Sequence, residues 1–500
     1  MSSVAARQDA PQPQQDTEFV RALTLTDATM LVAGSMIGSG IFIVSSDISR
    51  QVGSPFWLLM AWVMTGVITL LGALSLGELA AMYPRAGGQY VFLRESMGPL
   101  MGFLFGWTLF VVIQTGTIAA VAVAFGRFLG VLWPAITPER FGWFPSVDFN
   151  TPGGRIELGL TPQRLVALVS VWVLTWINLR GVKEGKLVQT TLTVVKTGAL
   201  ALLILLGLFI GRNAEALAAN FGPGRFMGGV EQLGPAFLVT FGAAMVGSLF
   251  SSDAWINVTF AASEVQNPRR NLPLALVLGT GLVTLLYVTA NISYLNVLPL
   301  QGVEGGGTVL ERGIQHATQD RVGTAAAEMI FGASAGTVMA IAILISTFGC
   351  NNGLILAGAR VYYAMARDGL FFRKAATLNA NAVPATALVA QSLWASFLCL
   401  TGTYGQLLDY VIFAALTFYV LTTAGLFVLR AKRPDAERPY RALGYPVLPA
   451  LYMLLCAAVA VILLVADKTR AQAVSGLVLV LLGVPVYFAW RGAARGPRTV

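Results

Sequence analysis

Two apolar runs of the sequence are each interrupted by small and polar residues. The first interruption spans residues 34–42 and holds three glycines and two serines in its first seven positions. A helix that unwinds there exposes backbone N–H groups at the start of its second half, and these groups, with the positive helix dipole, bind anions. The alternative is a helix-packing face, since Gly34 and Gly38 have G-x-x-x-G spacing. Gly40 lies off that face, so it favours a break.

The second interruption spans residues 242–255 and places Asp253 in the middle of an apolar run. A carboxylate at that depth of a membrane costs about 2.5–3.5 kcal/mol, so it needs a partner or a function. Paired interrupted helices in the two halves of a chain are typical of transporters built from inverted repeats, in which they form a central binding site. The two interruptions together favour such a site over simple helix packing.

Two further charges stand inside apolar runs. Lys196 has apolar residues on both sides, so it is either a functional cation or a side chain that extends its ammonium to the membrane surface. As a functional cation it either gains and loses a proton during a transport cycle or stays charged as a structural support. Glu78 is expected to pair with Arg85 or with another base in a nearby loop.

The elements that position these residues are membrane helices. The chain has 500 residues, of which 56% are hydrophobic and 11% charged, and its mean hydropathy is +0.71, whereas soluble domains are about one-quarter charged. About twelve apolar stretches are each long enough to cross a bilayer as a helix. Only helices and closed barrels satisfy the backbone in lipid, and the sequence has no series of alternating strands. It therefore predicts an all-α integral membrane protein.

The predicted spans have the usual boundary error of a few residues. They cover residues 24–46, 55–81, 97–131, 162–180, 188–211, 235–263, 271–297, 330–366, 385–402, 406–430, 445–466 and 472–491.

The charge distribution predicts the orientation of these spans. Residues 1–21 are rich in Gln, Pro and Ala, so they are predicted to form a disordered cytosolic tail and not a cleavable signal. With both termini in the cytoplasm, most Lys and Arg of the connecting segments fall on the cytosolic side, as the positive-inside rule requires. The predicted location is the cytoplasmic (inner) membrane. The net charge of +9 follows from this topology and indicates no nucleic-acid partner.

The residues that enzymes and metal sites need are scarce. Cys350, Cys399 and Cys456 all lie inside predicted spans, and His316 is the single histidine, so no disulfide framework, metal site or cofactor is expected. The short loops offer no catalytic cluster, which argues against a membrane-embedded enzyme. No G-x-x-x-x-G-K-[ST] loop is present, so ion gradients or exchange are the remaining energy sources for transport.

Five ordered motifs support a family resemblance. They are Gly38-Ser39-Gly40-Ile41-Phe42, residues 77–90 (GELAAMYPRAGGQY), residues 250–255 (FSSDAW) leading into 264–273 (EVQNPRRNLP), Ala366-Arg367-Asp368-Gly369, and Arg438-Pro439-Tyr440-Arg441 with Gly444-Tyr445-Pro446. Over nearly the whole chain after residue 21, these motifs resemble the amino acid, polyamine and organocation transporter superfamily, and within it the L-type amino acid transporter branch and its bacterial relatives.

The resemblance implies a leucine-transporter-like fold and a transport function. Two inverted repeats of five helices each, at residues 22–211 and 212–431, would be followed by two additional helices and a short cytosolic tail at 432–500. The implied function is alternating-access transport of amino acids, as an exchanger or a proton-coupled permease that does not depend on sodium. The alternative is a polyamine or other organic amine transporter. A receptor that binds without transporting would keep the same site.

The resemblance also assigns residues to the site. The substrate-binding set is Ser35, Met36, Gly38, Ser39, Gly40, Phe250, Ser251, Ser252 and Asp253. The backbone N–H groups at Ser39 and Gly40, helped by Ser35, would take the substrate carboxylate. Carbonyls near Phe250, Ser251 and Asp253 would take its ammonium. Phe250 would be an aromatic lid; otherwise it is a lipid-facing side chain. Lys196 matches a lysine that stands where other members bind sodium, with Thr347 as a candidate neighbour in this coupling site.

Three departures from the family pattern matter. Ala254 stands where many relatives have glycine, which costs backbone freedom and adds a methyl group near the pocket. Asp253 replaces a neutral residue of other members, so it either selects cationic substrates or hydrogen-bonds inside the protein. The loop at residues 132–161 has no cysteine, so no disulfide-linked glycoprotein subunit is expected. The expected state is a monomer or a weak homodimer.

Overall fold

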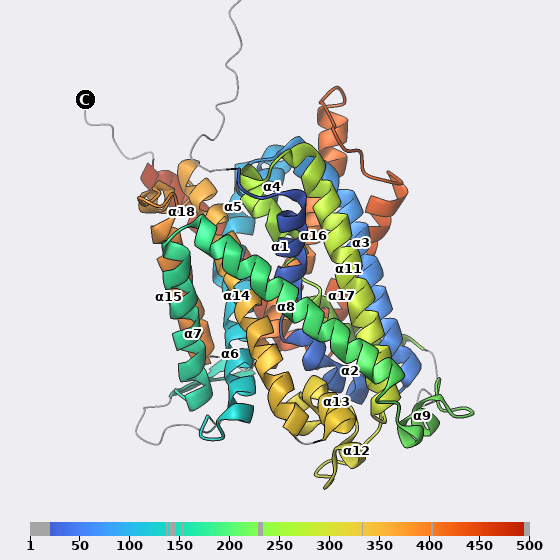
Figure 1. The fold of residues 1–500 in the computed structure, drawn as a ribbon. Coiled ribbons are helices and arrows are strands. Elements are labelled where there is room, and N and C mark those ends of the chain that lie inside the picture. Colours follow the sequence, from blue (N-terminus) through green and yellow to red (C-terminus); the bar gives the residue numbers. More distant parts are fainter. Residues whose placement is uncertain are drawn as a thin grey trace, which may run out of the picture.

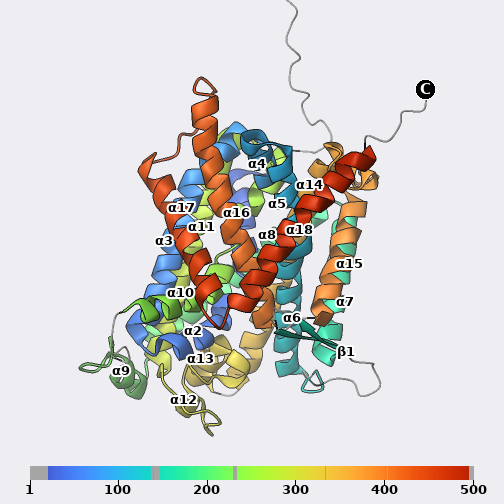
Figure 2. The ribbon, with the colours of Figure 1, turned by 180° about the vertical axis from the view of Figure 1, so that it is seen from behind.

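The computed structural model describes residues 21–136, 139, 147–151, 154–228, 234–332, 334–401 and 404–494. The described chain is a bundle of helices with one short hairpin (Figures 1 and 2). Of the predicted N-terminal tail, residues 1–20 lie outside the described residues.

The elements of the first half of the chain are α1 (Leu25–Met36), η1 (Gly40–Phe42), α2 (Val44–Val52), α3 (Pro55–Met82), α4 (Gln89–Met97), α5 (Pro99–Thr108), the π-helical turn η2 (Leu109–Ile113), α6 (Gln114–Leu132), β1 (Val147–Thr151), β2 (Gly154–Leu158), α7 (Pro162–Leu179), α8 (Val182–Phe209) and α9 (Ala214–Phe221). Those of the second half are α10 (Pro235–Ser251), η3 (Trp255–Glu264), α11 (Pro268–Val297), α12 (Val309–Arg312), η4 (Thr318–Asp320), α13 (Val322–Phe331), α14 (Ser334–Arg367), η5 (Arg373–Ala376), α15 (Ala385–Thr401), α16 (Tyr404–Lys432), α17 (Val447–Val465) and α18 (Arg470–Ala494).

All twelve predicted spans coincide with helices. Within the described residues, 10 helices are long and apolar enough to cross a membrane. The other two predicted spans differ from a simple crossing helix. The first is divided into α1, η1 and α2, and the ninth is α15, which has 17 residues. The antiparallel hairpin of β1 and β2, in the loop after α6, was not predicted. The prediction of an all-α membrane protein is confirmed apart from this hairpin.

The helices enclose the interrupted segments. α1 contacts α8, α11, α14 and η3, and α8 crosses obliquely in front of it (Figure 1). α3 and α11 run side by side. α17 and α18 lie on the face of the bundle opposite to α8 (Figures 1 and 2). The start of α1 and the end of α18 lie at one end of the bundle, here called the near end, while α9, α12 and α13 lie at the far end (Figure 1).

The buried carboxylate of Glu78 links several segments at the near end. Glu78 accepts hydrogen bonds from Arg430 (3.0 Å), Arg438 (3.1 Å) and the backbone N–H of Ala442 (2.7 Å). The predicted pairing with a basic residue is therefore confirmed, with Arg430 and Arg438 as the partners. This cluster joins the end of α3 to the end of α16 and the following loop.

Candidate functional site

The predicted break in the first span is confirmed. α1 ends at Met36, Ile37 leaves the helical region with ψ of 96°, and helical structure resumes at Gly40. Among the described hydrogen bonds, the backbone N–H groups of Gly38, Gly40 and Ile41 have no acceptor. Such N–H groups at the start of a helix attract a negatively charged group.

The second span breaks at the predicted place. α10 ends at Ser251, and η3 begins at Trp255. Ala254, between them, has a φ of 63°, in the left-handed region that favours glycine. Ala254 therefore adopts, at the break itself, a backbone conformation that alanine rarely takes. No donor to the carbonyl oxygens of Ser252 and Asp253 is found among the described hydrogen bonds, so these oxygens are suited to a cation.

The two breaks lie against each other. A Cβ built on Gly40 would lie 2.0 Å from Oγ of Ser251, so only a glycine allows this approach. The hydroxyl of Tyr287, on α11, lies 3.0 Å from the carbonyl oxygens of both Met36 and Ser251. Tyr287 thus joins the last turns of the two first half-helices. Sequence reasoning missed it, because nothing in its local pattern distinguishes it from other tyrosines of apolar helices.

Lys196 is buried beside the first break. Its side chain is 1% exposed, and its Nζ donates to the carbonyl oxygens of Gly34 (2.5 Å), Ile37 (2.6 Å) and Ser346 (3.5 Å). The three donors of the ammonium thus have three carbonyl acceptors from α1 and α14. This burial excludes a side chain that extends to the membrane surface.

Thr347 does not contribute to this arrangement. Its hydroxyl donates to the carbonyl oxygens of Ile343 (2.9 Å) and Leu344 (3.0 Å) within its own helix. The neighbouring Ser346 approaches the break instead, with its Oγ 3.1 Å from the carbonyl oxygen of Gly38. A helix rotates by about 100° per residue, so adjacent positions face different neighbours.

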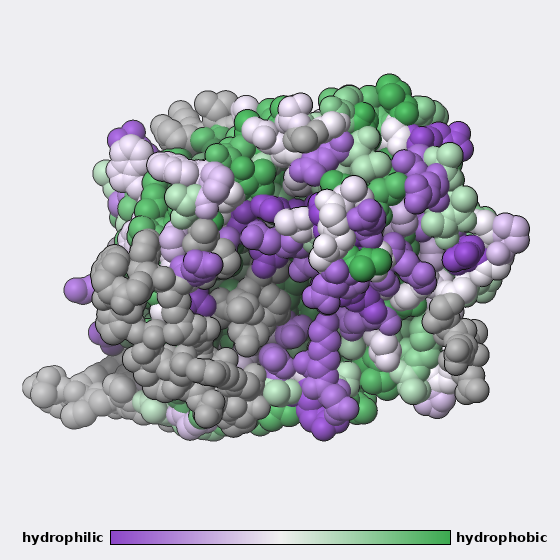
Figure 3. Space-filling view, turned by 90° about the horizontal axis from the view of Figure 1, so that it is seen from below, coloured by the Kyte–Doolittle hydropathy of each residue, from purple (hydrophilic) through white to green (hydrophobic). Residues whose placement is uncertain are grey.

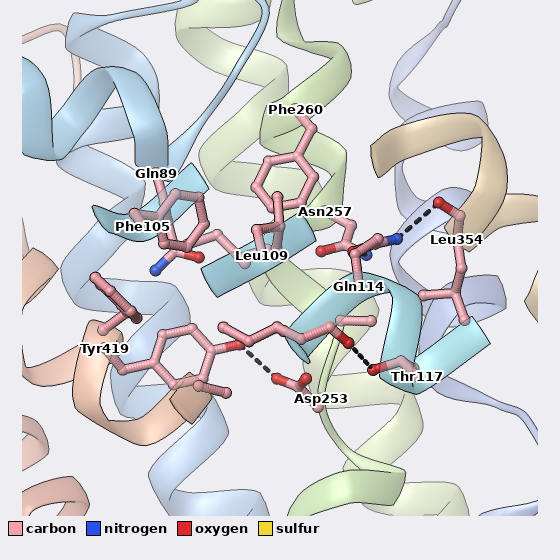
Figure 4. A pocket seen from close by; sticks show the side chains of 15 residues that line it. Gln89, Phe105, Leu109, Gln114, Thr117, Asp253, Asn257, Phe260, Leu354 and Tyr419 are labelled. Carbon is pink, nitrogen blue, oxygen red and sulfur yellow. Dashed lines mark hydrogen bonds between the residues drawn. The ribbon is translucent and has the colours of Figure 1, made fainter. Parts of the chain in front are cut away.

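Asp253 lies at the edge of a small cavity between η3, α6, α14 and α16 (Figure 4). Its Oδ1 accepts a hydrogen bond of 2.5 Å from the hydroxyl of Tyr419, whose ring packs against Trp255 at 5.6 Å between centroids. The cavity holds about 20 Å³, which is room for about one water molecule. In this conformation the site is closed around its polar groups.

Amide side chains face Asp253 across this cavity. Gln114 donates to the carbonyl oxygen of Leu354 (2.7 Å), and Asn257 donates to Gln114 (3.5 Å). Gln89 also lines the cavity (Figure 4). Gln114 follows directly after the π-helical turn η2, a distortion that is frequent at functional sites. Sequence reasoning missed these amides and Tyr419, although a glutamine in the middle of a membrane span is itself a signal.

The other predicted site residues are all buried but face different neighbours. Ser35 lies against α14, where a Cβ on Gly353 would be 3.1 Å from its Oγ. Ser251 donates from its Oγ to the carbonyl oxygen of Gly247 (2.7 Å). Ser252 lines a second small cavity with Asp253. Phe250 is 7% exposed, so it is not a lipid-facing side chain.

Contacts at both ends of the bundle close the site. At the near end, the backbone N–H of Leu23 donates to the backbone carbonyl oxygen of Glu264 (2.9 Å), and the carboxylate of Glu264 forms a buried ion pair of 2.8 Å with Arg360. At the far end, Arg50 on α2 pairs with Asp320 on η4 at 2.7 Å. Within the described residues, no cluster of His, Cys, Asp and Glu suited to a metal ion is found.

Comparisons of the sequence with known proteins show the family of this chain. The chain is 29% identical to the serine/threonine exchanger SteT of Bacillus subtilis (strain 168) over 480 residues, which cover 95% of this chain and 98% of that protein. It is 30% identical to the large neutral amino acids transporter small subunit 2 of Rattus norvegicus over 471 residues, covering 94% and 80%. It is 28% identical to the b(0,+)-type amino acid transporter 1 of Rattus norvegicus over 499 residues, covering 97% and 92%. The model of the amino acid permease family matches residues 23–487, so the chain belongs to this family of membrane transporters and is not an enzyme.

Proposed function

We propose that the chain carries amino acids across the cytoplasmic membrane by alternating access, with the substrate held between the two helix breaks. The observation that supports this proposal is the contact of the breaks at Gly40 and Ser251. The N–H groups of Gly38, Gly40 and Ile41 in the first break and the carbonyl oxygens of Ser252 and Asp253 in the second have no described hydrogen-bond partner. A zwitterion matches both, since its carboxylate meets the positive end of one half-helix and its ammonium the negative end of the other.

The proposed transport does not use sodium. The carbonyl oxygens of Gly34, Ile37 and Ser346 already coordinate the Lys196 ammonium. A fixed cation in this position repels a second one, because two like charges a few ångströms apart in a low dielectric interact strongly. Exchange and proton coupling both agree with this arrangement.

The surroundings of Asp253 favour substrates with a polar or cationic side chain. The Asp253 carboxylate receives hydrogen bonds from the hydroxyl of Tyr419 and from the backbone N–H of Ala254, and an ionised carboxylate has about four acceptor positions. Gln114 and Asn257 line the same cavity. When the cavity widens during the cycle, these groups are available to a side chain that donates hydrogen bonds.

A second candidate substrate class is an organic amine such as a polyamine. The same Asp253 and amide oxygens are suited to ammonium groups. A polyamine, however, has no anionic group for the N–H groups of Gly38, Gly40 and Ile41, so these would receive no acceptor from the bound ligand. The amino acid therefore fits both halves of the site, and the amine only one.

Each helix break belongs to one of the two halves of the chain. The matched breaks support two inverted repeats at residues 22–211 and 212–431, followed by 432–500. The near end, where α1 starts and α18 ends, would face the cytoplasm. Without a cysteine at residues 132–161, a disulfide to a glycoprotein subunit has no attachment point there, and a monomer or weak homodimer is proposed.

Binding and transport of the purified protein test this function. In detergent, a ligand at a hundred times its dissociation constant adds about 2.7 kcal/mol of stability, so thermal midpoints with the twenty amino acids, agmatine, putrescine and cadaverine identify the class. In proteoliposomes, uptake of a stabilising amino acid is expected when the lumen holds an amino acid or when a pH gradient is imposed. Replacing sodium with choline should leave this uptake unchanged. Stabilisation by amines alone would favour the second candidate, and sodium-dependent uptake would contradict the role given to Lys196.

A further inference from the structure

A larger cavity lies at the far end of the bundle, apart from the central site. Its volume is about 260 Å³, many times the space that one water molecule needs. The end of α6, helix α12, the segment before α13 and the first two turns of α13 line it. The lining residues are Val131, Val309, Arg312, Ala317, Thr318, Arg321, Thr324, Ala325 and Glu328. Hydrophilic side chains gather across the middle of this face of the molecule (Figure 3).

Two of the lining residues are arginines without a described carboxylate partner. Arg312 donates to the carbonyl oxygen of Gly306 (2.7 Å) and Arg321 to that of Thr318 (3.2 Å). Each guanidinium has five N–H donors, so most of its donors remain for another acceptor. Neither forms an ion pair among those the structure describes.

A third arginine adds to the positive charge near the cavity. Arg127, close to the end of α6, donates to the carbonyl oxygen of Gln319 at 3.4 Å. Burial, and after it the charge of Arg127, lower the pKa of Arg321, whereas Glu328 raises it. The positive charges of Arg127 and Arg321 therefore repel each other.

An unpartnered hydroxyl lines the same cavity. Thr324 is 5% exposed, and its Oγ1 has no hydrogen-bond partner within the described part of the chain. A buried hydroxyl without a partner costs free energy. Thr324 lies in the first turn of α13, whose N–H groups at Val322, Gly323 and Thr324 also have no described acceptor. Such N–H groups carry the positive end of the helix dipole.

The acidic residues nearby offset only part of this charge. Asp320 is paired with Arg50. Glu328 lies against α14, where a Cβ on Gly336 would be 2.4 Å from its Oε1, and burial raises the pKa of its carboxyl. The cavity is thus lined by two arginines, by the N-terminus of α13 and by one carboxylate, Glu328, whose pKa both arginines lower.

We propose that this cavity is a binding site for a small oxyanion, held by Arg312, Arg321, the hydroxyl of Thr324 and the first turn of α13. The site stands beside the closure of the far end, because a Cβ on Gly323 of α13 would lie 2.7 Å from the ring of Phe42 on η1. An anion bound to the first turn of α13 would therefore lie next to the residues that contact η1, just after the first helix break. A carboxylate of an arriving solute and free inorganic phosphate share the required chemistry. The site does not depend on the proposed function of the central breaks.

Thermal unfolding of the full-length protein in detergent tests this site. Sodium acetate or sodium phosphate replaces sodium chloride at constant ionic strength, and the midpoint is followed as a function of anion concentration. The wild type should show a saturable rise. Arg321→Gln should weaken the apparent affinity about tenfold or more, because it removes a charge-assisted contact. Thr324→Val keeps the shape and removes one neutral hydrogen bond, so a loss of about fivefold is expected.

The matched control is Arg212→Gln, which removes one positive charge from an exposed position after α8. Its anion response should equal that of the wild type.

A rise with acetate alone identifies carboxylates as the ligand class, a rise with phosphate alone identifies inorganic oxyanions, and a rise with both indicates a general oxyanion site. Absence of a saturable rise in the wild type overturns the proposal. So does an equal loss in Arg212→Gln and Arg321→Gln. If Arg321→Gln does not fold, an unchanged response of Thr324→Val is sufficient to reject the site.

Discussion

Gly40 and Ser251 touch across the two helix breaks, with 2.0 Å between an ideal Cβ on Gly40 and Oγ of Ser251. The contact joins the start of one second half-helix to the end of the opposite first half-helix. Any side chain at position 40 has to push the breaks apart. The spacing of the proposed substrate-binding groups therefore depends on the absence of a single methyl group at position 40.

Gly40→Ala should impair substrate binding. The added methyl group overpacks a buried contact, which costs about 1–3 kcal/mol, and it shifts the N–H groups of the first break. Ligand-dependent thermal shift with a stabilising amino acid measures the loss. Gly198→Ala is the control, since a Cβ at Gly198 on α8 meets no atom within 4 Å. Wild-type affinity in Gly40→Ala would contradict the assignment, and a partial recovery in the Gly40→Ala, Ser251→Gly double variant would support it.

Lys196→Met should alter both stability and the pH dependence of transport. Removing the ammonium leaves the buried carbonyl oxygens of Gly34 and Ile37 without their donor, and each loss costs about 1–3 kcal/mol. Uptake into proteoliposomes is measured across a range of pH values together with the thermal midpoint. Lys374→Met, at an exposed position, serves as the control. A wild-type pH profile in Lys196→Met would leave the lysine a purely structural role.

Asp253→Asn should change the preference between cationic and neutral amino acids. A direct charge contact is worth at least about 1 kcal/mol, or roughly a fivefold change in relative affinity. Competition of arginine and serine for the site measures this ratio. Tyr419→Phe is the companion variant, because it keeps the charge and removes the hydrogen bond to Oδ1; it should strengthen the preference for cations. A change smaller than twofold in Asp253→Asn would mean that the carboxylate has only an internal role.

Arg360→Met should strongly destabilise the closed near end. Its ion pair with Glu264 is 1% exposed on both sides, and removing one partner of a buried pair costs about 3–5 kcal/mol. Adding Glu264→Gln should restore much of the loss, because the unpaired charge is then gone. Arg269→Met tests the exposed pair with Glu437, whose side chains are 59% and 72% exposed, and should change stability by less than about 1 kcal/mol. Equal effects of the two arginine variants would refute a closure that depends on the buried pair.

The helices and the places where they break could be predicted from the amino-acid sequence. Long apolar runs are helical in lipid whatever their neighbours, since no other structure satisfies the backbone there. The glycines at positions 34, 38 and 40 and the carboxylate of Asp253 are local features, and both breaks lie where these residues predicted them. The sequence left open whether Lys196 is buried or extends to the membrane surface, and the structure shows that it is buried.

The side chains that meet at the breaks could not be predicted from the sequence, because they come from distant helices. Lys196 and Gly34 are 162 positions apart, and Tyr419 and Asp253 are 166 positions apart, so no local pattern relates them. Ser346 and not Thr347 reaches the first break, because the rotation of α14 is set by its packing against α6, α8 and α15. Tyr287 likewise acquires its role from the position of α11 between the two breaks. Helix formation is a local property of the chain, whereas the pairing of side chains depends on how distant helices pack.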